Sequence, residues 1–146
     1  MARAVQGLVA LSVVTACAPA AIGCGSHASR TGGDEAVLRV TEKDFKISAP
    51  AAVRAGDVRL VVRNPGPDDH ELLFVRAPIV GTLPMRPDGV TLDEDAFEHT
   101  TAAVVESKPP GTVTELRLRL APGRYLLLCN MSGHYLGGMH TTVVAR

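Results

Sequence analysis

The sequence contains no tryptophan, and aromatic residues of all kinds make up only 3% of its 146 residues. Its hydrophobic core must therefore be built from Val, Leu and Ala with a few Phe and Tyr. Lys and Arg together number 15, Asp and Glu together number 15, and the net charge at pH 7 is zero. Domains that bind nucleic acid usually carry a basic surface. The charge balance therefore argues against nucleic acid as a partner, and the length fits one domain.

Long stretches of helical periodicity are also missing. Short alternating segments are separated by Pro and Gly instead, and the clearest of them is Glu-Leu-Arg-Leu-Arg-Leu at 115–120. Its leucines are expected to face inward and its arginines outward. Strands are predicted at 37–41, 45–48, 58–63, 71–75, 102–106, 113–120, 124–128 and 141–145. Short strands with regular turns predict an all-β fold, a Greek-key β-sandwich.

The stretch 78–100 is long and acidic, and it matches no ligand motif. We expect it to form a surface excursion between the two sheets. Acidic residues suit a helix N-terminus, so a short helix is predicted near 93–98.

Residues 1–24 have the features of a signal peptide. Arg3 supplies a short positive region, and 4–23 is uncharged and mostly apolar. Small residues precede both Cys17 and Cys24, as at the cysteine that is lipidated in lipoproteins. Such a cysteine carries more than one acyl chain, which gives a stable membrane anchor. We therefore expect an extracytoplasmic protein, in the periplasm or at the cell surface, anchored to the membrane through one of these cysteines.

Two other interpretations of the leader remain open. It can be a plain secretory signal with neither cysteine modified, or an uncleaved membrane anchor. Pro19 and the short apolar span argue against the anchor. In each case 25–36 is expected to be a flexible, Gly- and Ser-rich tether, and 37–146 the folded domain.

Cysteine is scarce, and its placement is informative. Two of the three cysteines lie in the leader, so Cys129 has no disulfide partner within the domain. A solitary thiol outside the cytoplasm is open to oxidation. Coordination of a metal ion gives such a thiol a chemical reason to persist.

Three candidate metal ligands recur at five-residue intervals: Cys129, His134 and Met139. Cysteine and methionine sulfurs are soft donors that favour copper, and imidazole also suits it. Two histidines and one cysteine with a weak axial methionine describe a mononuclear electron-transfer copper site. This set requires one further histidine. Three glycines in the same segment give the loop the backbone freedom to wrap a metal.

His70 supplies the missing histidine. It follows the turn-forming segment 64–67, Asn-Pro-Gly-Pro, and lies where the predicted strand 71–75 begins. At this rim position we expect His70 to be partly shielded from solvent. Cys129 lies at the end of the predicted strand 124–128. Two strand ends at one pole of a sandwich can place side chains at coordination distance, about 2 Å from a shared metal.

With these residues the chain resembles a small cupredoxin over 37–146. Four residues separate Cys129 from His134 and four separate His134 from Met139, as in the loops of sulfocyanin and rusticyanin. The resemblance implies a type 1 (blue) copper site with His70, Cys129 and His134 as equatorial ligands and Met139 as the axial one. It also implies electron transport with a transient redox partner protein, without enzymatic activity. We expect a monomer.

Other functions are possible for the same residues. Taken singly, Cys129 can be an inert buried thiol and His70 a surface turn residue. The same four ligands would serve an extracytoplasmic copper carrier or storage protein that relays no electrons. A catalytic copper oxidase needs more histidines than the five present. The dinuclear copper site of cytochrome oxidase needs a second thiolate in the loop.

Neighbouring residues are assigned lesser roles. His140 directly follows Met139, so its side chain is expected to point to the opposite face from Met139, toward solvent or the rim. Met131 is too close to Cys129 to become the axial ligand. Glu71 and Asn130 adjoin ligands and are expected to orient them. The remaining predictions are a solvated His99, and a weak docking patch for the redox partner formed by Tyr135 and Leu136.

Overall fold

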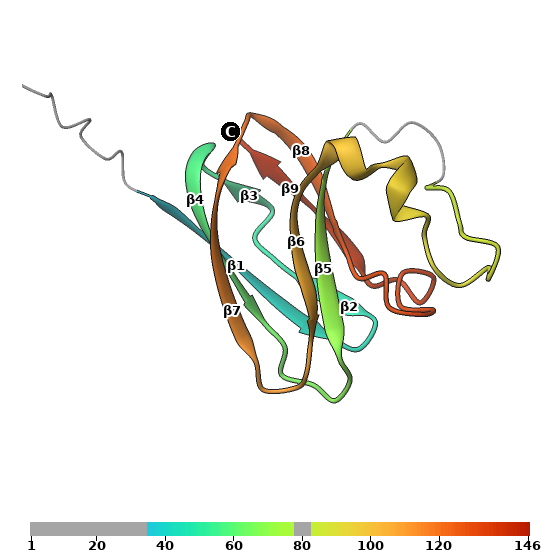
Figure 1. The fold of residues 1–146 in the computed structure, drawn as a ribbon. Coiled ribbons are helices and arrows are strands. Elements are labelled where there is room, and N and C mark those ends of the chain that lie inside the picture. The colour runs from blue at the N-terminus through green and yellow to red at the C-terminus, as the bar shows by residue number, and fades with distance from the viewer. Residues whose placement is uncertain (1–34, 78–82) are drawn as a thin grey trace, which may run out of the picture. The chain divides into compact units, whose positions relative to one another are not determined.

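The computed structural model describes residues 35–77 and 83–146. The predicted signal peptide with Cys17 and Cys24, and the tether up to residue 34, lie outside the described residues. Strands and two short 3-10 turns follow one another along the described chain (Figure 1): β1 (Ala36–Lys43), β2 (Lys46–Ser48), β3 (Ala52–Val53), β4 (Gly56–Arg63), β5 (His70–Arg76), η1 (Glu94–Ala96), η2 (Glu98–Thr100), β6 (Thr101–Lys108), β7 (Val113–Leu120), β8 (Gly123–Leu128) and β9 (His140–Ala145).

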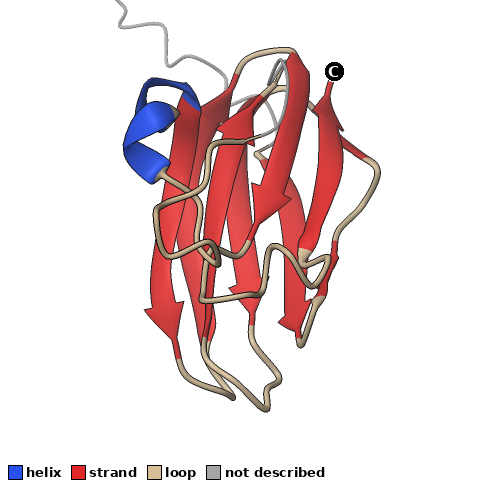
Figure 2. Ribbon diagram, turned by 90° about the vertical axis from the view of Figure 1, so that its right-hand side faces the viewer, coloured by secondary structure: helices blue, strands red, loops and turns tan. Residues whose placement is uncertain are grey.

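The strands form two sheets that face each other (Figure 2). One has the order β2-β1-β4-β7 and the other the order β3-β9-β8-β5-β6. Two pairs, β1 with β4 and β3 with β9, are parallel, and the other pairs are antiparallel. The predicted all-β Greek-key sandwich is confirmed. Every predicted strand is present with bounds within two residues, whereas the two-residue β3 was missed because it is too short to show alternation.

The main core lies between the sheets. It is built by inward-facing aliphatic residues such as Leu38 and Val40 of β1 and Leu60 of β4, all essentially inaccessible to solvent. Each fully buried side chain of this size contributes about 1.5–3 kcal/mol. Aromatic residues are few, but Phe74 and Tyr125 pack with ring centroids 5.1 Å apart, and the Tyr125 hydroxyl donates to the Ala121 carbonyl at 2.9 Å.

The segment 83–100 lies in a different place from the one we predicted. It connects β5 to β6, which belong to the same sheet, so it does not lie between the two sheets. Leu92 and Phe97 are buried against Leu73 and Val75 of β5, on the outer face of the five-stranded sheet. β5 is therefore buried on both faces. The predicted short helix is present as the turns η1 and η2.

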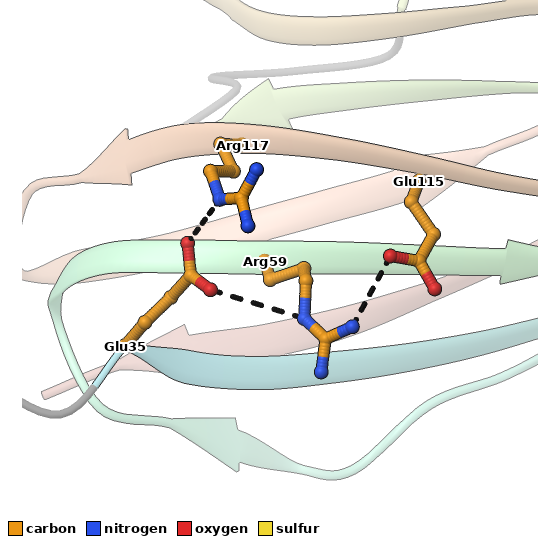
Figure 3. A network of polar contacts seen from close by, with 4 residues as sticks. All are labelled: Glu35, Arg59, Glu115 and Arg117. Atoms are coloured by element: carbon orange, nitrogen blue, oxygen red, sulfur yellow. Dashed lines mark hydrogen bonds and ion pairs between the residues drawn. The ribbon is translucent and has the colours of Figure 1, made fainter.

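The outer face of the four-stranded sheet is polar. The guanidinium group of Arg59 lies 3.1 Å from a carboxylate oxygen of Glu115 and 3.8 Å from one of Glu35 (Figure 3). The guanidinium group of Arg117 lies 2.8 Å from the other carboxylate oxygen of Glu35. Exposed ion pairs of this kind contribute about 0–1 kcal/mol each. This face is a solvated surface, in line with the predicted outward arginines of β7. No helix within the described ranges is long and apolar enough to cross a membrane.

Candidate metal centre

Three predicted ligands meet at one pole of the sandwich. The donor atoms of His70, Cys129 and His134 all lie within 4.8 Å of one another. The Cys129 sulfur is 3.5 Å from Nδ1 of His134, and the two imidazole centroids are 5.2 Å apart. His70 is the first residue of β5, Cys129 follows the last residue of β8, and His134 lies in the loop to β9. They form a potential metal site.

A fixed turn positions His70. The buried Asn64 side chain accepts a hydrogen bond from the backbone N–H of Gly66 at 2.7 Å. Its amide nitrogen donates to the carbonyls of Asp68 at 2.8 Å and Lys108 at 2.9 Å. Both the turn and the end of β6 are thereby tied to one side chain. The prediction of a partly shielded His70 was wrong, because the ring is 0% exposed.

The electrostatic surroundings keep His70 neutral. Burial, reinforced by the neighbouring His134, lowers its pKa, while Asp44 and Asp68 oppose this change. Nε2 lies 3.4 Å from a carboxylate oxygen of Asp44, but not in hydrogen-bond geometry. Both ring nitrogens are therefore buried without a hydrogen bond. A neutral imidazole with a free nitrogen is the form that binds a metal.

Cys129 is buried and forms no disulfide. Burial raises the pKa of its thiol to about 11, and the carboxylates of Glu42 and Glu71 raise it further. Backbone hydrogen bonds from Glu71 and Met131 act in the opposite direction. The thiol is therefore protonated at neutral pH, and a bound metal must displace its proton.

The loop between β8 and β9 closes on itself. Cys129 donates its N–H to the Met139 carbonyl at 3.1 Å, and Met139 donates to the His134 carbonyl at 3.0 Å. Gly133 and Gly138 have φ of 77° and 94°, a region that favours glycine. Met139 is completely buried and belongs, like Cys129, to the main core. Its axial role stays a prediction.

The other candidates lie apart from this cluster. His140 and His99 are exposed, which matches their predicted positions. The His140 ring stacks on Tyr135 with centroids 5.1 Å apart. Met131 packs against the main core. Met85, which belongs to the segment 83–100, packs against the buried cluster that this segment forms with β5.

Asn130 connects that segment to the ligand loop. Its carboxamide oxygen accepts the backbone N–H of Leu92 at 2.6 Å, and its nitrogen donates to the Leu92 carbonyl at 3.1 Å and to Glu94 at 2.7 Å. A backbone hydrogen bond from Asn130 in turn reaches the carboxylate of Glu71. Burial raises the pKa of Glu71 to about 6, helped by the charge of Glu94. Through these contacts Glu71, next to His70, is linked to Asn130, next to Cys129, and Asn130 is linked to the segment 83–100.

We expect Asn130→Ala to loosen the ligand loop from the segment 83–100. The substitution leaves the buried N–H and carbonyl of Leu92 without partners, which costs about 1–3 kcal/mol. The measurement is urea unfolding of the metal-free protein. Asn130→Asp is a second test variant: it keeps the acceptor for Leu92, loses the donor, and should also be destabilised because its carboxylate faces Glu94. Wild-type stability for Asn130→Ala would contradict the expectation.

Two neighbours of the site were missed from the sequence. Asp44 lies beside His70, and the Phe45 ring lies 5.5 Å from that of His134. Both belong to the four-residue turn Lys43-Asp-Phe-Lys46 between β1 and β2, far from the ligand motifs in the sequence. An aromatic residue in a short polar turn was the available signal.

No family model and no curated protein matches the chain. Solved structures do resemble it. An auracyanin from Roseiflexus castenholzii has a TM-score of 0.55 at 17% identity, covering 75% of this chain and 96% of that protein. Auracyanin A from Chloroflexus aurantiacus, a "blue" copper protein, has a TM-score of 0.53 at 16% identity, covering 75% and 98%. Rusticyanin from Thiobacillus ferrooxidans has a TM-score of 0.51 at 14% identity, covering 75% and 77%.

The described domain therefore has the cupredoxin fold, and the predicted resemblance is confirmed for the fold. Within that fold, His70, Cys129 and His134 form the potential metal site described above.

Proposed function

We propose that this protein is an electron-transfer protein with a mononuclear type 1 copper site. His70, Cys129 and His134 would be its equatorial ligands and Met139 its axial ligand. The observation that carries the proposal is the approach of three donor groups to within 4.8 Å of one another. A copper ion held there supplies one-electron chemistry by alternating between its +1 and +2 states.

The chemistry of the donors favours copper. A thiolate, two imidazoles and a thioether are the soft and borderline donors that copper prefers. Magnesium and calcium favour oxygen donors, and structural zinc sites contain only cysteine and histidine ligands, without methionine. The buried Met139 beside Cys129 is therefore the residue that separates a copper site from a zinc site.

The chain holds the donor atoms in fixed positions and shields them from solvent. His70 begins β5 and Cys129 follows β8, two strands that pair directly with each other in the five-stranded sheet. Both side chains are fully buried. Donors fixed in this way change position little when charge changes, which keeps the reorganisation required for electron transfer small.

Titration of the purified protein with copper(II) tests the proposal. We expect one equivalent to bind and to produce an intense visible band from the cysteine thiolate, which a reductant bleaches and an oxidant restores. Tyr125, buried and engaged with Ala121, offers no comparable ligand. Binding without a thiolate band would contradict a type 1 site.

A copper carrier would use the same ligands, and only copper exchange distinguishes it from an electron relay. The complete burial of His70 and Cys129 favours retention. A relay keeps its copper through many redox cycles in the presence of a chelator. Loss of the ion to that chelator within a few cycles would favour the carrier.

His134 is the proposed exit for electrons, because it is the only one of the three donor residues with an exposed part. Leu136, two residues further along the loop, is 58% exposed. Redox encounters use small interfaces, so one apolar side chain beside the exit can matter. We propose that Tyr135 and Leu136 belong to the docking patch for the redox partner.

We expect Leu136→Lys to slow electron self-exchange between oxidised and reduced copies about tenfold, equivalent to about 1.4 kcal/mol. The reason is that two lysines would face each other across the encounter. Val104→Lys, at an exposed position in the middle of β6, is the control and should leave the rate unchanged. An unchanged rate in Leu136→Lys would remove Leu136 from the patch.

We also propose export and lipid anchoring through Cys17 or Cys24, based on the leader sequence. Detergent phase partition of the protein made in its natural host measures this. One of the variants Cys17→Ser and Cys24→Ser is expected to move the protein from the detergent phase to the aqueous phase. If neither variant changes the partition, the anchor is absent or of another kind.

A further inference from the structure

The turn between β1 and β2 touches both imidazoles of the candidate site. It belongs to the four-stranded sheet, whereas His70 and the strands flanking His134 belong to the five-stranded one. Asp44 lies against His70 and Phe45 lies against His134, although the two turn residues are adjacent in sequence. A single turn of one sheet is therefore in contact with donors that the other sheet presents.

The contact of Asp44 with His70 has the arrangement of a carboxylate behind a metal-binding imidazole. One oxygen of Asp44 lies 3.4 Å from Nε2, and that oxygen is itself buried without a hydrogen-bond partner. Nε2 has no other partner either. Ligating histidines commonly give their second ring N–H to a carboxylate, which fixes the tautomer and the ring orientation. Asp44 lies on the Nε2 side of the ring without forming this hydrogen bond in the structure, so it would hold the ring through its position and charge and leave Nδ1 of His70 as the nitrogen available to a metal.

Phe45 occupies a conformation that needs a reason. Its φ is 57°, and it is the one non-glycine residue with positive φ in the part of the chain that the structure describes. Such a conformation costs about 1–2 kcal/mol, and the side chain is still 53% exposed. The ring meets His134 edge to face, at 5.5 Å and 61°, a favourable geometry for aromatic pairs.

Gly137 shows that the loop is shaped to receive this ring. A Cβ atom built on Gly137 would lie 2.2 Å from Cδ1 of Phe45, and its three nearest atoms all belong to that ring. The φ of Gly137 is not positive, so its backbone would accept alanine. The absence of a side chain at this position is therefore explained by Phe45 alone.

We propose that the Asp44-Phe45 turn is a clamp that positions both histidines of the copper site: Asp44 orients His70, and Phe45, seated on Gly137, braces His134. Asp44 and Phe45 are thus positioning residues, and the inference rests on the proposed copper site. The clamp also gives the strained turn a function, because both of its contacts end on metal-binding rings.

Asp44→Asn tests the first contact through the reduction potential of the copper-loaded protein. The amide keeps the size of the side chain and removes a negative charge near the metal. We expect the potential to rise, since the reduced ion carries less positive charge, while the visible band remains. Asp57→Asn, at the start of β4 and so at the far end of that strand from the His70 turn, should leave the potential unchanged. An unaltered potential in Asp44→Asn overturns this half of the clamp.

A double substitution tests the second contact. Gly137→Ala is expected to speed the loss of copper to a chelator at least about tenfold, in the range seen when groups behind metal ligands are removed. Phe45→Ala should also speed it, but Gly137→Ala should have almost no effect in the Phe45→Ala background, because the clash is gone. Gly138→Ala, strained at φ 94° with open space around it, is the control that Phe45→Ala cannot rescue.

Urea unfolding of the metal-free variants completes the test. Gly137→Ala is expected to lower the free energy of unfolding in the wild-type background but not in the Phe45→Ala background. This difference depends only on the packing of Phe45 on Gly137. Equal damage from Gly137→Ala with and without Phe45 overturns the clamp. A wild-type protein that develops no thiolate band overturns the proposed copper site itself, whatever the variants do, so the two failures are distinguishable.

Discussion

Cys129→Ser eliminates the visible band of the copper-loaded protein completely, whereas Cys17→Ser and Cys24→Ser leave it intact. This is the result we expect, because Cys129 is the one cysteine of the described domain and its sulfur lies 3.5 Å from His134. The band requires a thiolate bound to copper, and serine offers a hard, protonated oxygen in its place. Absorption spectra of the three variants, titrated with copper(II), provide the measurement.

Proton release gives an independent measure of the same event. The pKa of the Cys129 thiol is raised to about 11 by burial, so the thiol is protonated at neutral pH before copper binds. Copper binding should therefore release about one proton from wild-type protein and none from this position in Cys129→Ser. The affinity for copper should rise with pH for the same reason. A band that survives in Cys129→Ser would exclude Cys129 as the ligand.

Glu42→Gln is expected to stabilise the metal-free protein at alkaline pH by several kcal/mol. Glu42 faces inward from β1 and is only 2% exposed, and one of its oxygens has no hydrogen-bond partner. Burial, followed by the charge of Glu71, raises its pKa from 4.5 to about 8. The folded protein therefore holds this proton over a pH range in which the unfolded chain has lost it.

The sign follows from this difference in proton binding. The folded state binds more protons between about pH 4.5 and 8, so the free energy of unfolding falls as pH rises through that range. Each unit of difference between the two pKa values corresponds to about 1.4 kcal/mol. Glutamine is neutral throughout. The increase in the free energy of unfolding that Glu42→Gln gives over wild type should be absent below about pH 4.5 and complete above about pH 8.

Urea unfolding near pH 5 and near pH 9 measures the effect. Glu98→Gln, at an exposed position in η2, is the matched control and should show no pH-dependent gain. Equal stability of Glu42→Gln and wild type at the higher pH would mean that the Glu42 carboxylate is solvated or paired in solution.

Local patterns were sufficient for the strands. β7 shows why: Leu116, Leu118 and Leu120 alternate with arginines, and this period of two is the geometry of a strand with one buried face. β3 was missed because two residues carry no period, and its existence depends on pairing with β9. The segment 83–100 was misplaced for a related reason. Its buried Leu92 and Phe97 form no regular pattern, and only the outer face of β5 gives them a place.

The candidate ligands were predictable because metal chemistry restricts residue types and the loop restricts their spacing. Their surroundings were not. Asp44 and Phe45 are 26 and 89 residues away from the histidines they contact, counting from 44 to 70 and from 45 to 134. No local pattern relates positions so far apart when a turn of one sheet meets the ligands of another.

The amino-acid sequence by itself determined the strands and the candidate metal ligands, and it suggested the separation of the leader from the domain. Each of these depends on short-range periodicity, composition or donor chemistry. The tertiary structure decided that His70 is fully buried, that the segment 83–100 supports the ligand loop through Asn130, and that a strained turn reaches both imidazoles. The physical reason is that burial and contact between distant segments arise only when the two sheets pack. A residue's chemical type is fixed by the sequence, but the neighbours that tune it are fixed by that packing.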